Sequence, residues 1–248
     1  MYINDINILY YLGIGIIGLL VGQFIDWCNK RLPEYKKVFS KEFFTVYFKE
    51  AKPKYLLMVM TAAMYVGLLY FFGFSIDTLK YMFLVPMLIS AFVIDYRLQI
   101  IPNRLTLTIF ETGLIFTFAS VLINTNAGIS IFMNNMLGMI VGGGIFLIIT
   151  LIGGLIAGKD AMGFGDVKLM GALGLFFGWM NIIMIAVMAF LLAAVISIII
   201  LVSRKKKADE YIPFGPFIVI SAIIAMFVPS TLLLTALFKI FTLGLYKG

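Results

Sequence analysis

Long apolar runs occur throughout this sequence and constrain its fold more than any other feature. A helix needs about 20 apolar residues to cross the hydrocarbon core of a bilayer, because it rises about 1.5 Å per residue. Runs that meet or approach this length lie near residues 8–27, 55–74, 79–96, 105–123, 134–157, 167–179, 181–202 and 214–229. The alternating pattern of a membrane β-barrel does not appear. We therefore predict an all-α bundle of about eight transmembrane helices.

The composition supports a membrane protein. Of the 248 residues, 62% are hydrophobic and 12% are charged, whereas in soluble domains about half are apolar and about a quarter charged. The apolar stretch 231–246 fits either a further span or a helix lying in the interface. No Pro/Gly/Ser-rich linker divides the chain, so we predict one membrane domain, with a first span and basic loop at 1–54 and the main transmembrane bundle at 55–248.

Basic residues are concentrated in alternate connections between the apolar runs. The connections after the first, third, fifth and seventh runs hold 16 of the 19 Lys and Arg residues. Because positive charge stays on the cytoplasmic side, these connections are predicted to be cytoplasmic and the N-terminus external. We expect a multi-pass protein of the cytoplasmic (inner) membrane.

The longest polar segment, from Arg31 to Lys54, is basic and rich in aromatic residues. This mixture predicts a surface helix on anionic lipid, and we expect membrane lipid rather than nucleic acid as its partner.

Two residue types that commonly carry catalysis are almost absent. The chain has no His and one Cys, Cys28. This excludes Ser-His-Asp catalysis, His-based zinc sites and a CxxC pair, and we expect no bound metal. Among the usual chemistries of membrane proteolysis, only paired aspartates remain.

Two acidic residues lie where apolar runs meet the predicted cytoplasmic loops. Asp95 ends the third run, shortly before Pro102 and Asn103, and Asp166 opens the sixth. Each has a structural alternative, since Asp95 could pair with a nearby arginine and Asp166 could cap a helix. Their common depth favours a catalytic pair that shares a proton.

The segment around Asp166 has features that suit a peptide-binding site. Gly163 and Gly165 permit positive φ and leave room for another backbone beside the carboxylate. Helix dipoles suggest that Asp166, at a helix start, is the base, and that Asp95, near a helix end, is the acid.

Glu111, in the fourth predicted span, is expected to be bonded within the bundle or to contact substrate. Two other functions stay open at this point. A proton- or cation-coupled transporter could use Asp95 and Asp166 as relay groups, and a structural scaffold of a secretion assembly would need neither acid.

Four stretches of the chain resemble the type IV prepilin leader peptidases, which share a GxGD signature with presenilin-type proteases. They are residues 18–33, IDYRLQIIPN at 94–103, GFGDVKL at 163–169 with the glycines that follow, and IPFGPF at 212–217. The resemblance implies cleavage of the leader peptide of prepilins or pseudopilins after Gly at the cytoplasmic membrane face. It implies catalysis by Asp95 and Asp166, supported by motif residues Gly163, Gly165, Pro102, Asn103 and Lys168.

The chain departs from many bacterial members in one region. Those members carry two CxxC pairs that bind zinc between the first two spans, and they methylate the new N-terminus with S-adenosylmethionine. Here this region is only Leu32 to Lys54 and contains no Cys. The resemblance therefore implies peptidase activity that needs no cofactor, with S-adenosylmethionine required only if methyl transfer is retained.

Overall fold

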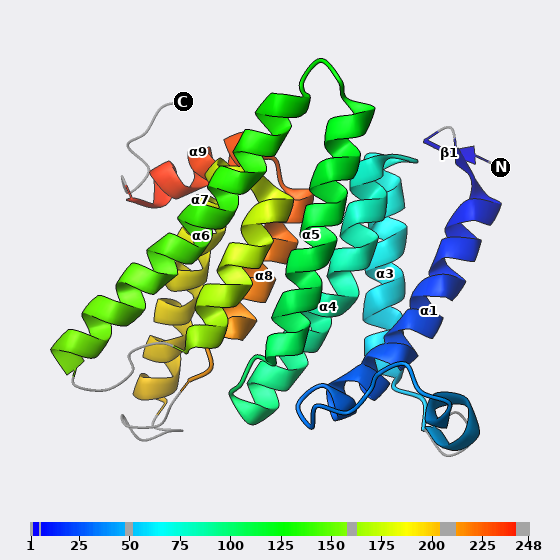
Figure 1. The fold of residues 1–248 in the computed structure, drawn as a ribbon, viewed down its shortest axis with the longest axis horizontal. Coiled ribbons are helices and arrows are strands. Elements are labelled where there is room, and N and C mark those ends of the chain that lie inside the picture. The colour runs from blue at the N-terminus through cyan, green and yellow to red at the C-terminus, as the bar shows by residue number, and fades with distance from the viewer. Residues whose placement is uncertain (1, 5, 48–51, 158–162, 204–211, 242–248) are drawn as a thin grey trace.

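A computed structural model describes residues 2–4, 6–47, 52–157, 163–203 and 212–241 (Figure 1). The chain is helical almost throughout, which confirms the predicted all-α class. Strands β1 (Tyr2–Ile3) and β2 (Ile6–Asn7) form a short antiparallel pair before the first helix. The helices are α1 (Ile8–Arg31), the π-helical turn η1 (Phe43–Tyr47), α3 (Tyr55–Phe72), α4 (Ile76–Leu98), α5 (Asn103–Ile123), α6 (Gly128–Ala157), α7 (Phe164–Val202), α8 (Gly215–Phe227) and α9 (Ser230–Phe241).

Six of these helices, α1 and α3 to α7, are long and apolar enough to cross a membrane. α7 contains 39 residues, but its backbone leaves the helical conformation at Gly178, where φ is 75°. The chain turns back at this break, so the two halves of α7 correspond to the separately predicted runs 167–179 and 181–202 (Figure 1). Counting these halves separately and adding the 13-residue α8 gives eight passes, and this number remains a prediction.

The helix ends agree with the predicted two-sided arrangement. The C-terminal ends of α1 and α4 lie at the same end of the bundle as the N-terminal ends of α3, α5, α7 and α8 (Figure 1). This is the end that the basic residues mark as cytoplasmic. α9, with 12 residues, crosses the opposite end. Of the ambiguous stretch 231–246, residues 242–246 lie outside the described part of the chain.

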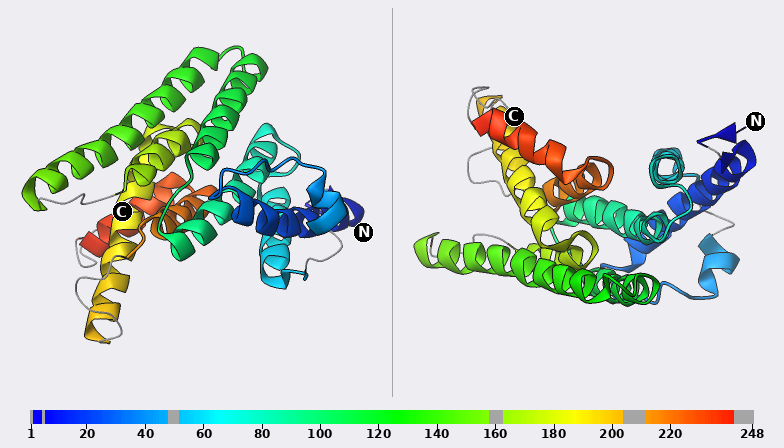
Figure 2. Two further views of the ribbon diagram at one scale, coloured as in Figure 1. Left: turned by 60° about the horizontal axis from the view of Figure 1, so that its bottom comes forward. Right: turned by 90° about the horizontal axis from the view of Figure 1, so that it is seen from above.

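Glycines allow close contact between neighbouring helices. A Cβ atom on Gly174 of α7 would lie 2.1 Å from the carbonyl oxygen of Gly138 of α6, and one on Gly22 of α1 would lie 2.4 Å from the Cα atom of Met58 of α3. Small residues let helix backbones approach in this way within a membrane, where dispersion contacts rather than hydrophobic burial hold helices together. Figure 2 shows α1 and α3 on one side of the bundle, with α6 extending away from them.

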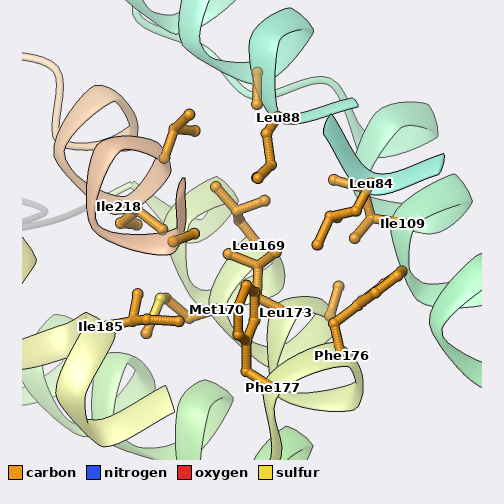
Figure 3. Close-up of a cluster of buried hydrophobic side chains, with 14 of the residues drawn as sticks. Leu84, Leu88, Ile109, Leu169, Met170, Leu173, Phe176, Phe177, Ile185 and Ile218 are labelled. Atoms are coloured by element: carbon orange, nitrogen blue, oxygen red, sulfur yellow. The ribbon is translucent and has the colours of Figure 1, made fainter. Parts of the chain in front are cut away.

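A buried apolar cluster joins α4, α5, α7 and α8 (Figure 3). Leu84 and Leu88 of α4 and Leu169 and Leu173 of α7 are fully buried, as is Ile218 of α8. Because this cluster fixes the four helices against one another, it also fixes the polar residues at the predicted cytoplasmic end of the bundle.

The basic loop after α1 folds back onto the bundle, and we call residues 32–47 the strap. The indole N–H of Trp27 donates to the carbonyl of Val38 (2.8 Å), and Arg104 of α5 donates to the carbonyl of Tyr35 (2.7 Å). Within residues 32–47 the only helical element is η1, so the surface helix predicted from residue spacing does not form in that part. Instead, the hydrogen bonds from α1 and α5 hold the strap in a largely irregular conformation.

Candidate active site

Asp95 lies in the last turn of α4 and is 4% exposed. One oxygen of its carboxylate, Oδ2, accepts a hydrogen bond of 2.9 Å from the backbone N–H of Gly215. Gly215 is the first residue of α8, and the first N–H groups of a helix have no partner within the helix. The start of α8 thus provides a donor, and the positive end of its dipole, to the Asp95 carboxylate.

Asp166 lies in the first turn of α7 and is also 4% exposed. Gly163 occupies the N-cap position of this helix, so Asp166 is not the cap that the structural alternative required. Its Oδ1 atom is buried and has no hydrogen-bond partner among the described residues. Asp166 lies within electrostatic range of Asp95, and α8 packs against the helices of both residues. The structure thus places two buried carboxylates near each other.

The segments beside the two aspartates are in contact with each other. A Cβ atom on Gly165 would lie 3.0 Å from the Cβ atom of Ile101, and Lys168 donates a 2.8 Å hydrogen bond to Oδ1 of Asn103. Pro102, which is buried, is the N-cap of α5. The structure thus brings the predicted motif residues of α5 and α7 together at the end of the bundle that was predicted to be cytoplasmic.

Gly165 of the Asp166 motif acts through its size, because a side chain there would meet Ile101. Positive φ occurs only at Gly73 and Gly178 among the described glycines, so the predicted use of positive φ at Gly163 and Gly165 is wrong. The space that a side chain would fill at Gly165 is taken by Ile101 instead.

Residues 82–198, which include both aspartates, match the model of the type IV leader peptidase family. A prepilin leader peptidase/N-methyltransferase of Legionella pneumophila is 34% identical over 156 residues, covering 63% of this chain and 52% of that protein. Proteins of the same name from Aeromonas hydrophila (28% identical, 60% of this chain and 49% of the relative) and Neisseria gonorrhoeae (29%, 67% and 54%) also match.

Over residues 82–198 the chain is therefore similar to the type IV leader peptidase family. It spans about half the length of the curated relatives it matches. No solved structure matches it.

Glu111 does not have the environment that its place in an apolar run suggested. Its side chain is exposed on the outer face of α5, and no ion pair to it occurs among the described residues. The expectation that it is bonded within the bundle is therefore wrong. Residues three or four positions apart share one face of a helix, and the buried face of α5 carries Leu105, Ile109 and Phe116. Glu111 lies outside this face and is therefore exposed.

Gly215 is the residue at the site that sequence reasoning missed. The closing motif IPFGPF was noted as part of the family pattern, but nothing in it indicates a partner 120 positions earlier. The one available signal was a Gly-Pro pair at a predicted helix start, where free N–H groups gather.

The ion pair between Asp95 and an arginine, which was the structural alternative to a catalytic role, is not found among the described residues. Arg104 binds the strap carbonyls instead. Within the same part of the chain, no three His, Cys, Asp or Glu side chains lie close enough together to hold a metal ion.

Proposed function

We propose that this chain is an aspartic endopeptidase that cleaves the leader peptides of prepilins or pseudopilins after Gly at the cytoplasmic membrane face. The proposal rests on the proximity of Asp95 and Asp166, two buried carboxylates at the cytoplasmic ends of α4 and α7. Similarity to the leader peptidase family over residues 82–198, and to proteins named prepilin leader peptidase/N-methyltransferase, supports the substrate class.

The chemistry requires two carboxylates that share one proton. One activates a water molecule, which attacks the scissile carbonyl carbon, while the other donates a hydrogen bond to the carbonyl oxygen. The Gly215 N–H stabilises negative charge on Asp95, whereas Oδ1 of Asp166 has no such donor among the described residues. We therefore assign Asp95 as the base and Asp166 as the holder of the shared proton, the reverse of the roles that helix position alone suggested.

A transporter would favour acids near the middle of the bilayer, where ions cross. Asp95 and Asp166 instead occupy the last turn of α4 and the first turn of α7. Their position favours a site that a substrate reaches from the membrane surface.

The proposal is tested by incubating the purified chain in detergent with a synthetic prepilin. Asp95→Asn and Asp166→Asn should each reduce cleavage on the order of a thousandfold or more, as loss of a catalytic group does. Asp77→Asn is the matched control, since Asp77 lies at the opposite end of α4 and pairs with Lys80 (2.7 Å). Cleavage that survives in either catalytic variant, or is lost equally in the control, contradicts the assignment.

Methyl transfer is a separate activity. The relatives carry N-methyltransferase in their name, but the region between α1 and α3 has no cysteine in this chain. We restrict the proposal to proteolysis and expect no transfer of label when S-adenosylmethionine with a labelled methyl group is added to the cleavage assay.

A further inference from the structure

Three hollows meet at Phe24 of α1, beside the strap. The largest, of about 540 Å³, is lined by Leu20 and Phe24 and extends to Met58 of α3. A second, of about 370 Å³, is lined by Ser40 and Lys41 of the strap. A third, of about 220 Å³, lies between α1, the strap and α4. Together they form a groove that runs from the apolar surface of α1 to the cytoplasmic end of the molecule.

Apolar and polar groups occupy different ends of this groove. Leu20, 62% exposed, lines it on the membrane-facing surface of α1. At the strap end, the buried hydroxyl oxygen of Ser40 has no hydrogen-bond partner among the described residues, and Lys41 is exposed beside it. Gln23 and Tyr47, the polar residues that line the largest hollow, bond to each other at 2.9 Å. Such a groove fits a molecule with a long apolar part and one anionic end.

The charges around the groove favour an anion. Each described acidic side chain of α1 and the strap already has a basic partner: Asp26 with Lys30, Glu34 with Lys36, and Glu42 with Arg31. The hydrogen bond and charge of Lys36 lower the pKa of Glu34, which keeps that acid ionised and paired. The remaining described lysines nearby, which have no carboxylate partner in the described residues, are Lys37, Lys41, Lys52 and Lys54.

We propose that this groove binds an anionic phospholipid of the cytoplasmic leaflet. An acyl chain lies along Leu20 and Phe24, and the phosphate accepts hydrogen bonds from Ser40 and Lys41. Phe39, 89% exposed at the same edge, enters the interface as aromatic anchors do. The groove is separate from the active site, since neither Asp95 nor Asp166 lines any of its three hollows. The proposal therefore does not depend on the peptidase function.

Lipid binding to the purified full chain can be measured by native mass spectrometry during titration with phosphatidylglycerol or phosphatidylcholine. The wild type should bind phosphatidylglycerol more tightly. Lys41→Gln should weaken that binding about fivefold, because a lysine near anionic lipid contributes about 1 kcal/mol. Lys239→Gln, at an exposed position of α9, is the matched control and should bind as the wild type does.

A second variant tests the apolar end of the groove. Leu20→Trp should occupy part of the 540 Å³ hollow and weaken phosphatidylglycerol binding, and the exposure of Leu20 lets the larger side chain fit without unfolding the bundle. Equal affinity of the wild type for the two lipids overturns the proposal, as do equal losses in Lys41→Gln and Lys239→Gln. Binding of soluble glycerol phosphate as tight as that of the intact lipid would indicate a simple anion site and also overturn it.

Discussion

Replacing Gly215 by Ala tests how the active site is built. A Cβ atom at this position would lie 2.6 Å from Oδ2 and 3.0 Å from Cγ of Asp95, closer than packed atoms tolerate. Either the Asp95 carboxylate or the start of α8 must therefore move, and the 2.9 Å hydrogen bond between them lengthens or breaks. In most helices Gly→Ala is stabilising by about 0.5–1 kcal/mol, so a harmful effect here would be specific to the site.

The expected loss follows from that hydrogen bond. A hydrogen bond to a charged group contributes about 1.5–3 kcal/mol, and about 1.4 kcal/mol changes a rate tenfold. We expect kcat/KM for cleavage of a synthetic prepilin in detergent to fall about 10- to 100-fold in Gly215→Ala. Gly144→Ala is the matched control, because a Cβ atom on Gly144 of α6 would have no neighbour within 4 Å. Its activity should stay within about twofold of the wild type.

Circular dichroism and the melting temperature of each purified variant separate a local effect from unfolding. The reasoning is refuted if Gly215→Ala folds normally and cleaves at the wild-type rate while Asp95→Asn is inactive. It is also refuted if Gly144→Ala loses as much activity as Gly215→Ala, because the loss would then follow from any added methyl group.

Three further predictions concern packing, contacts near the site and pH. Gly174→Ala should lower the melting temperature far more than Gly144→Ala, since its Cβ would lie 2.1 Å from the Gly138 carbonyl oxygen. Lys168→Met and Asn103→Ala should each lower kcat/KM less than tenfold, because their mutual contact is exposed; in a double-mutant cycle the two losses should not add. Burial and the hydrogen bond to Asp26 raise the pKa of Tyr47 above its usual value near 10. The stabilisation by this contact is therefore complete below about pH 10 and is lost as pH rises through the raised pKa, so above pH 10 the melting temperature should fall more steeply in the wild type than in Tyr47→Phe.

Composition predicted much of this fold because a bilayer restricts what an apolar chain can do. Runs of sufficient length must become helices, and the placement of Lys and Arg orients them. These two rules place Asp95 and Asp166 at one end of the bundle before any contact is known, and in the structure both acids are buried there, within electrostatic range of each other.

The same rules could not predict features that depend on which helix faces which. Glu111 lies in an apolar run whether it points inward or outward, and only the packing of α5 decides that it is exposed. The strap was expected to form a surface helix from residue spacing, but spacing does not include the bonds from Trp27 and Arg104 that fix its path. The break at Gly178 depends on close contact with Asn134 of α6, which no local pattern reveals.

The roles of the two aspartates depend on a third helix. Asp95 lies at the negative, C-terminal end of the dipole of its own helix, and Asp166 lies at the positive, N-terminal end of its helix. These dipoles alone would stabilise the ionised form of Asp166 more than that of Asp95. α8 changes this balance, because its first N–H group reaches Asp95 from a different part of the chain. A direct hydrogen bond at 2.9 Å acts more strongly on a carboxylate than the dipole of the helix that carries it. The proposed base is therefore Asp95, and the IPFGPF segment belongs to the site because it begins the helix that makes this bond.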